Sequence, residues 1–309
     1  MYPYALIDLH CDTLTDCGKG DASKSDTLED PAKVLSLSAI PQQTHWAQFY
    51  AVFTPDQIRG QGAIDYFAAN RANFDRQMEK FADRVIPCRT AGDMERAWAE
   101  GKTAAFLTVE NGSVLAGRMD QVDVMARAGV KAFTLTWNGE NEIGSGHVTG
   151  HGLSPFGRAV IPALEERRIL VDVSHLNDTG FRQVLDIARR PFVATHSNAR
   201  AVCPHRRNLT DDMFRAIRDS GGVVGLNLYR PFVGPAGTME ELVAHVEHFL
   251  ALDGEKTLCI GGDLDGCEAL AAGMNGAEDV PQLYEALEKR GYGKALLEDI
   301  FWNNLRRLL

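Results

Sequence analysis

The sequence has no long hydrophobic run. No uncharged apolar stretch reaches the ~18 residues that a membrane-spanning helix needs. The first residues, MYPYALIDLHCD, do not combine a basic segment with a long apolar one, as an export signal does. We therefore expect a cytoplasmic protein that does not act at a membrane.

Positive charge is also scarce. The chain has 32 Lys and Arg against 42 Asp and Glu, which gives a formal net charge of −10 at pH 7. A protein of this charge repels phosphate backbones and anionic lipids on average. We therefore expect no nucleic-acid partner.

Cysteine is sparse, and its spacing offers no disulfide or zinc framework. The six cysteines include no C-x-x-C pair, and we expect them to be free thiols. They are Cys11, Cys17, Cys88, Cys203, Cys259 and Cys267. The 309 residues also contain no Ser/Pro/Gly linker, no low-complexity tract and no internal repeat, so no domain boundary can be placed from composition.

Short β-rich apolar runs alternate with amphipathic stretches along nearly the whole chain, the pattern of a parallel sheet with crossover helices. We predict eight strands: Ala5–Leu9, Ala47–Phe53, Ala104–Val109, Ala132–Thr136, Leu170–Val173, Phe192–Thr195, Val223–Leu228 and Thr257–Ile260. We predict helices at 62–83, 92–100, 117–128, 157–168, 178–189, 211–219, 237–252 and 280–307. Ser154 and Thr210 are expected N-caps, and Gly221 is expected to end the helix that Thr210 begins.

Eight strand and helix units in about 300 residues predict an α/β fold, a single (β/α)₈ TIM barrel that spans residues 1–309. The main rival is a doubly wound open sheet, which carries a glycine-rich phosphate loop after its first strand. Here His10, Cys11 and Asp12 follow the first predicted strand instead. The barrel is therefore the favoured fold.

The residues at the carboxyl ends of the predicted strands are mostly metal-ligand types, and in a barrel these ends carry the chemistry. They are His10 and Asp12, Glu110, His175, His196 and Asp263. His10 and Asp12 are two residues apart, so in an extended strand both point to the same face. Histidine and carboxylate ligands in this mixture favour zinc, with manganese, cobalt or iron as alternatives.

Five ligands (His10, Asp12, Glu110, His175 and His196) are too many for one tetrahedral zinc with an open position, but they suit two metals that share a carboxylate. Two metals roughly 3.5–4 Å apart can hold a bridging hydroxide near neutral pH, so this set predicts a hydrolase. Asp263 could move a proton from that water to a leaving amine. An EF-hand calcium loop that begins at Asp263 is excluded because its sixth residue is Glu268 rather than glycine. Asp265 could instead be an N-cap.

At this point the sequence resembles the membrane (renal) dipeptidases, zinc metallopeptidases with an amidohydrolase-like barrel. The resemblance covers nearly the whole chain, in family order. It rests on the segments Asp8–Thr13, Val109–Gly112, Gly152–Gly157, Val171–His175, Thr195–Ala199, Arg206–Asn208 and Gly262–Gly266. The animal members that are membrane-bound carry an export signal and an anchor signal. This sequence shows neither and is closer to a bacterial-type soluble form.

The resemblance implies roles for individual residues. His10 and Asp12 would bind one zinc, His175 and His196 the other, and Glu110 would bridge both and so take part in catalysis. Asp263 matches the catalytic aspartate of the family. Arg207 matches the arginine that binds the substrate's C-terminal carboxylate. The implied substrates are dipeptides, including L,D dipeptides, and N-acyl amino acids, and the implied assembly is a homodimer.

The sequence departs from the family at one position. The best-known members have a histidine after the fourth strand that binds the substrate carbonyl, whereas this chain has Trp137 there. An indole N–H can only donate a hydrogen bond and cannot transfer a proton. Asn138, His147 or His151 could replace the missing substrate-binding group. Two alternatives therefore stay open: a hydrolase of the same barrel class that acts on a lactone or cyclic amide, and a metal-binding relative with weak catalysis.

Other candidate residues are assigned to structure. His245 and His248 have helical spacing but belong to an outer helix, which faces away from the barrel mouth. His205 is expected to be a loop histidine, and Cys11 is expected to point away from the face that His10 and Asp12 share. Trp46, Phe49 and Tyr50 are expected to lie mostly in the core, although an aromatic residue at the mouth of that strand could touch a substrate.

Overall fold

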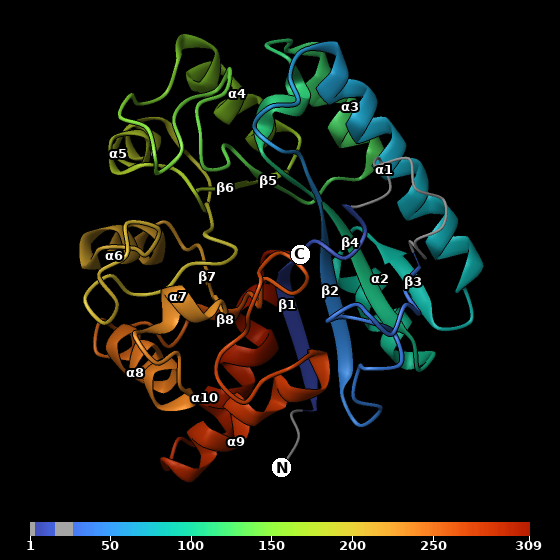
Figure 1. Ribbon diagram of the computed structural model, residues 1–309, viewed down its shortest axis with the longest axis vertical. Coiled ribbons are helices and arrows are strands. Elements are labelled where there is room, and N and C mark those ends of the chain that lie inside the picture. The colour runs from blue at the N-terminus through green and yellow to red at the C-terminus, as the bar shows by residue number, and fades with distance from the viewer. Residues whose placement is uncertain (1–3, 16–26) are drawn as a thin grey trace.

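Eight parallel strands form the centre of the computed structural model, which describes residues 4–15 and 27–309 (Figure 1). They are β1 (Ala5–Cys11), β2 (His45–Phe53), β3 (Val85–Cys88), β4 (Thr103–Glu110), β5 (Ala132–Thr134), β6 (Leu170–Asp172), β7 (Val224–Leu226) and β8 (Leu258–Ile260). Seven of them follow the order β6-β5-β4-β2-β1-β8-β7, and β3 pairs with β4. The strands are long on one side of the sheet, where β1, β2 and β4 lie, and short on the other.

The two ends of this order, β6 and β7, are joined through the segment 192–195. Single bridges pair Asp172 with Val193 and Ala194 with Val224, so the sheet closes into a barrel. We predicted a strand at this position, but the segment makes only these bridges. The reason is that the backbone N–H of Thr195 donates to the Asp172 carboxylate at 2.9 Å. In a continuous strand, this N–H would donate to a backbone carbonyl of the neighbouring strand. Gly225 is required beside it, because a Cβ there would lie 1.9 Å from the Thr195 carbonyl oxygen.

Strand β3 was missed from the sequence. It pairs with residues 103–106, the first half of β4, whereas β5 pairs with residues 108–110 at the end of β4. Pro87 lies inside β3 and argues against a central strand. A proline is compatible with a short strand only at the edge of a sheet, and β3 lies at such an edge.

Helices cover the outside of the barrel (Figure 1). The α-helices are α1 (Gln61–Lys80), α2 (Ala91–Ala99), α3 (Asp120–Ala128), α4 (Pro155–Glu166), α5 (Asp178–Ile187), α6 (Asp211–Asp219), α7 (Arg230–Val233), α8 (Met239–Leu250), α9 (Pro281–Lys289), α10 (Lys294–Glu298) and α11 (Asn304–Arg306). The described residues also include two 3₁₀ turns, η2 (Gly112–Leu115) and η3 (Ala277–Asp279), and a π-helical turn, η4 (Asp299–Asn303). The single helix predicted at 280–307 is wrong, because the chain breaks it at Gly291, whose φ of 91° is left-handed.

The predicted helix caps are confirmed. The Ser154 hydroxyl accepts a hydrogen bond from the Gly157 N–H at 2.9 Å, and the Thr210 hydroxyl accepts one from Met213 at 3.3 Å. Each satisfies an N–H that the helix itself leaves unpaired. Gly221, with a φ of 79°, follows α6 as expected.

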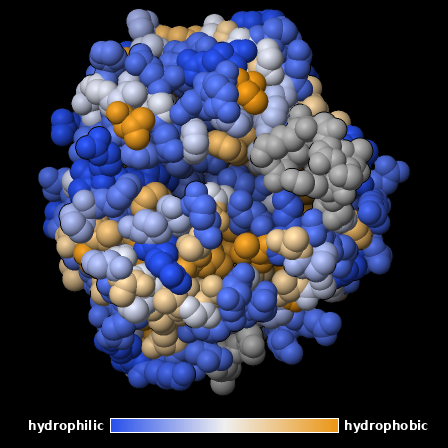
Figure 2. Space-filling view, in the orientation of Figure 1, coloured by the Kyte–Doolittle hydropathy of each residue, from blue (hydrophilic) through white to orange (hydrophobic). Residues whose placement is uncertain are grey.

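Aromatic side chains of β2 and β4 fill the centre of the core. Trp46, Phe49 and Tyr50 are buried, as predicted, and the rings of Phe49 and Phe106 stack at 4.9 Å between centroids. The face of the molecule in Figure 2 is mostly hydrophilic, with hydrophobic residues only in small groups. Across the described ranges, no helix has both the length and the apolar character that crossing a membrane would require. The described cysteines are free thiols, and Cys17 lies outside the described residues.

Candidate metal centre

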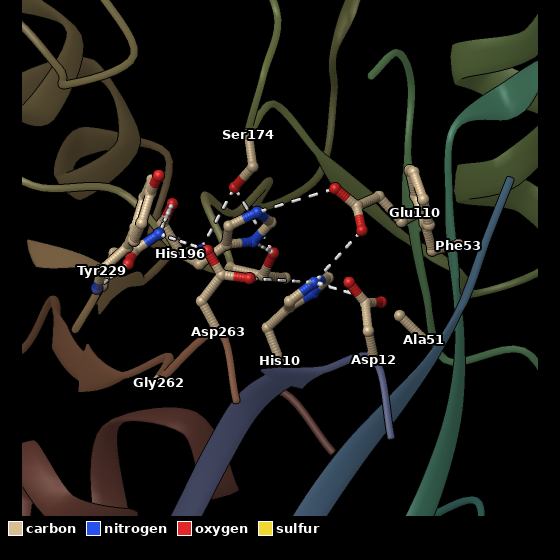
Figure 3. A network of polar contacts seen from close by, with 12 residues as sticks. His10, Asp12, Ala51, Phe53, Glu110, Ser174, His196, Tyr229, Gly262 and Asp263 are labelled. Carbon is tan, nitrogen blue, oxygen red and sulfur yellow. Dashed lines mark hydrogen bonds and ion pairs between the residues drawn. The ribbon is translucent and has the colours of Figure 1, made fainter. Parts of the chain in front are cut away.

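His10 and Asp12 come from the end of β1 and point into the same cluster, as their spacing predicts (Figure 3). The Nε2 atom of His10 lies 3.8 Å from Asp12 Oδ1 and 3.3 Å from Glu110 Oε2, at the end of β4. His10 Nε2 and Asp12 Oδ1 are both buried without a hydrogen-bond partner. Two unpartnered buried atoms that face each other are costly unless something binds between them.

The other oxygen of Glu110 faces two histidines from the opposite side of the barrel. Glu110 Oε1 lies 2.8 Å from His175 Nε2 and 3.9 Å from His196 Nε2. The two Nε2 atoms are 3.0 Å apart. The two oxygens of Glu110 therefore face different histidines, Oε2 facing His10 and Oε1 facing the pair, while the rings of His10 and His196 stack 3.9 Å apart.

Outer hydrogen bonds fix which nitrogen of each histidine carries the proton. The Thr195 hydroxyl donates to Asp172 Oδ2 at 2.6 Å, so its oxygen is left to accept from His196 Nδ1 at 2.8 Å. Asn138 Oδ1 lies 2.9 Å from His175 Nδ1 and can only accept. Both Nδ1 atoms therefore carry hydrogen, and both Nε2 lone pairs point at each other and at Glu110. Such an arrangement is repulsive until a cation joins it, and it is the one that histidine metal ligands use.

The charges of the cluster lead to the same conclusion. Burial lowers the pKa of His10, but Glu110, Asp12 and Asp263 outweigh burial and raise this pKa to about 10. Burial raises the pKa of Asp12 well above its ordinary value, and the neighbouring Glu110 adds to the shift. The site thus concentrates carboxylates that a cation would stabilise. Two overlapping groups of donor atoms, His10 with Glu110 and His196, and His10 with Asp12 and Asp263, lie close enough to hold a metal ion.

Asp263 follows β8 and completes the cluster. One carboxylate oxygen, Oδ2, accepts a hydrogen bond from Asn227 Nδ2 at 3.0 Å, and the other lies 3.9 Å from His10 Nε2. Asp263 has a φ of 59° and His175 a φ of 67°, a left-handed conformation that is uncommon for these residues and often found at functional sites. Gly266 is required beside Asp263, since a Cβ would come within 2.4 Å of its Oδ1.

Arg207 lies behind His196 and is almost fully buried. Its Nη1 donates to Ser197 Oγ at 2.8 Å and its Nη2 to the His196 carbonyl at 3.0 Å, while its Nε is buried without a partner. Burial lowers the pKa of Arg207 to about 10, opposed by Asp263 and other carboxylates, so the side chain stays charged at neutral pH. A guanidinium with unused N–H groups can still bind an anion.

The three residues predicted to replace the missing histidine lie in different places. Asn138 is hydrogen-bonded to His175, as described above. The ring of His147 lies 6.1 Å from that of His175. His151 does not join the cluster: its side chain is 83% exposed and pairs with Glu140 at 3.2 Å. Trp137 packs edge to face against Phe53, with 4.8 Å between ring centroids.

The residues assigned to structure behave accordingly. His245 is buried, with its Nδ1 accepting from the Ala199 N–H at 3.1 Å and its Nε2 at 2.8 Å from the Val233 carbonyl. His248 pairs with Asp211. Asp265 caps no helix and instead accepts a hydrogen bond from Thr13 Oγ1 and two from backbone N–H groups of the segment that precedes β2.

Sequence reasoning missed two buried aspartates that support the ligands. Asp8 accepts the backbone N–H groups of His10 at 2.9 Å and Gly262 at 3.1 Å, and Asp172 accepts those of Ser174 and Thr195, both at 2.9 Å. Each aspartate therefore ties two strand ends together behind the metal ligands. The available signal was a single carboxylate inside an apolar run, ALIDL or LVDV.

The barrel and the cluster define a metal-dependent hydrolase with an amidohydrolase-like fold. Residues 1–309 match the family model described as membrane dipeptidase (peptidase family M19). The chain belongs to this family and is therefore a metallopeptidase.

Similar proteins agree with this assignment. The chain is 34% identical, over 74% of its length and 89% of the other, to a Klebsiella pneumoniae protein described as "Uncharacterized protein in pqqA 5'region". A solved structure described as the dipeptidase AC, a metallo peptidase of family M19, is 26% identical, with a TM-score of 0.91 over 99% of this chain and 98% of that one.

Two further solved structures share the fold. A Rhodobacter sphaeroides metallo peptidase, liganded with a phosphinate mimic of L-Ala-D-Ala, has a TM-score of 0.91, 24% identity and coverage of 99% and 98%. A Pseudomonas aeruginosa amidohydrolase has a TM-score of 0.83, 22% identity and coverage of 99% and 95%.

Proposed function

We propose that this protein is a dinuclear zinc dipeptidase that hydrolyses the peptide bond of dipeptides. The observation that carries the proposal is that the two carboxylate oxygens of Glu110 face different histidines, Oε2 facing His10 and Oε1 facing the His175–His196 pair. A carboxylate in this position can be shared by two metal ions. In this assignment His10 and Asp12 would hold one zinc, His175 and His196 would hold the other, and Glu110 would serve both.

When bound, two zinc ions would supply a water of lowered pKa and polarise the substrate carbonyl. Asp263 is placed to take the proton of the attacking water and return it to the leaving amine. Its Oδ1 faces the cluster, while Asn227 holds its Oδ2 in place.

Arg207 sets the length of the substrate. Its unpartnered Nε and its remaining N–H groups are suited to a planar carboxylate near the metal centre. A free carboxylate one residue beyond the scissile bond limits the substrate to dipeptides and N-acyl amino acids. The phosphinate mimic of L-Ala-D-Ala bound by the Rhodobacter sphaeroides neighbour supports the inclusion of L,D dipeptides.

The test is metal content by plasma mass spectrometry together with hydrolysis of L-Ala-L-Ala and L-Ala-D-Ala. Wild type is compared with Glu110→Gln and with Glu140→Gln, which makes the same change at an exposed position. We expect about two zinc per chain in wild type, with metal and hydrolysis lost in Glu110→Gln and kept in Glu140→Gln.

Other outcomes decide between the alternatives. Two zinc without turnover of any L,L or L,D dipeptide refutes the dipeptidase assignment and favours a lactone or cyclic amide as substrate. Arg207→Met should raise the KM for dipeptides, whereas the same change at Arg215, an exposed residue of α6, should not. An unchanged KM in Arg207→Met would remove the carboxylate clamp from the proposal.

A further inference from the structure

His147 lies on a loop that is held firmly over the carboxyl ends of β5 and β6. The Gly146 N–H donates to the Gly139 carbonyl at 2.7 Å, and Gly146 also forms a bridge with Leu176, just after β6. A Cβ at Gly146 would lie 1.9 Å from the Trp137 carbonyl oxygen, so this position requires glycine. The close packing on both sides fixes the backbone that leads into His147.

The His147 ring lies near the metal centre and has one nitrogen without a partner. It is half-buried between two other rings, 6.1 Å from that of His175 and 6.2 Å from that of His205. Its Nδ1 is buried and has no hydrogen-bond partner. Burial, with the charge of Arg207, lowers the pKa of His147 to about 3, so the ring is neutral and offers one N–H and one lone pair.

The other two predicted replacements, Asn138 and His151, already have partners. The Asn138 side-chain oxygen orients His175, and His151 is exposed and paired with Glu140. Trp137 packs on Phe53, and its ring lies 6.5 Å from that of His175, slightly farther than the ring of His147. His147 alone of the three predicted replacements combines proximity to the cluster with an unpartnered polar atom.

We propose that His147 binds the carbonyl oxygen of the scissile peptide and donates a hydrogen bond to it from Nδ1 as negative charge develops there. The inference rests on the proposed dipeptidase function. It assigns to His147 the carbonyl-binding role that the resemblance implies for a histidine at position 137, where this chain has tryptophan. A substrate oxygen at the metal centre beside His175 comes within reach of this ring. Elsewhere, one such donor contributes ~10²–10³ in turnover.

The test compares substitutions at His147 with matched changes at two histidines outside the cluster, His151 and His248. His147→Leu removes the donor, His147→Asn places an amide N–H close to the position of Nδ1, and His147→Gln places one close to that of Nε2. His151→Leu and His248→Leu remove histidines that pair with exposed carboxylates. For each protein we would measure bound zinc, kcat and KM for L-Ala-D-Ala, and the Kd of a phosphinate dipeptide, which mimics the tetrahedral state.

We expect His147→Leu to keep its zinc, to lose kcat by about 10²-fold and to weaken phosphinate binding by a similar factor. His147→Asn should recover more of both than His147→Gln, and the two control variants at His151 and His248 should match wild type. A purely structural role for His147 would lower zinc content and thermal stability instead, and would show no rescue by asparagine.

Several results would overturn the inference. Wild-type kcat and phosphinate affinity in His147→Leu would do so while leaving the dipeptidase assignment intact, as would a loss in His151→Leu instead. If wild type binds the phosphinate but hydrolyses no dipeptide, the affinities of the variants still decide. If wild type neither hydrolyses dipeptides nor binds the phosphinate, the proposed function fails and this inference fails with it.

Discussion

Replacing Thr195 with valine tests whether the outer hydrogen bonds prepare the metal ligands. The Thr195 hydroxyl links Asp172 to His196, which is almost fully buried. Valine keeps the volume of threonine but cannot accept the His196 Nδ1–H. The proton can then move to Nε2, where it occupies the lone pair that a metal needs.

The structure sets the size of the effect. A buried N–H left without an acceptor costs about 1–3 kcal/mol, and loss of an outer-shell partner typically lowers metal affinity by about 10–100-fold. We therefore expect Thr195→Val to bind zinc about 10–100-fold more weakly and to unfold at lower denaturant concentration than wild type.

The assay is zinc retention against a competing chelator, together with chemical denaturation of the metal-free protein. Thr108→Val is the matched control, because Thr108 is buried in β4 and its hydroxyl has no hydrogen-bond partner. Thr108→Val should bind zinc as wild type does. If Thr195→Val and Thr108→Val bind zinc equally tightly, then Thr195 does not set the proton position of His196 and the argument is wrong.

Three further predictions concern other parts of the chain. Gly266→Ala should lose zinc and activity while its circular dichroism stays that of wild type, because the added Cβ would press on two carboxylates of the cluster. Burial lowers the pKa of His245, so this residue stabilises the fold above pH 6.5 and its contribution is lost as pH falls further. Urea unfolding at pH 7 and 5.5 should therefore show a shallower pH dependence in His245→Gln, by at most ~1.4 kcal/mol per pH unit, and an unchanged pH dependence would contradict this role of His245. Ser154→Ala should cost about 1 kcal/mol in the same assay through loss of the α4 cap, and an unchanged free energy of unfolding would contradict the cap's role.

The metal cluster could be predicted from the sequence because its members follow strands. A ligand at the carboxyl end of a parallel strand lies at the same end of the barrel as every other, so His10, Glu110 and His196 could be grouped without knowing the packing between them. The same argument does not distinguish His147 from His151. They are four residues apart in a loop, and only the packing of Gly146 and the pairing with Glu140 decide which one faces the cluster.

Elements that depend on tertiary contacts also could not be predicted from sequence patterns. Pro87 argues against a strand, so β3 was not predicted. Residue propensity alone does not reveal that the first half of β4 has room for a further strand beside it. Asp8 and Asp172 looked like interruptions of apolar strands, yet they accept backbone N–H groups from neighbouring strands. Their partners lie up to 254 residues away in the sequence, so no local pattern contains them.

The strands of the barrel differ in length, so the backbone holds the two halves of the cluster with different numbers of hydrogen bonds. His10, Asp12 and Glu110 are carried by β1 and β4, strands of seven and eight residues that both pair with β2. The pairing of β4 with β2 is unbroken, and that of β1 is irregular only between Asp8 and Cys11. His175 and His196 follow a three-residue strand and a segment held by two single bridges. Local opening costs least where few hydrogen bonds must break. The histidine pair therefore lies on the less extensively paired side of the barrel. In the proposed dinuclear assignment, we expect a metal ion bound there to exchange first and one bound by His10 and Asp12 to exchange last.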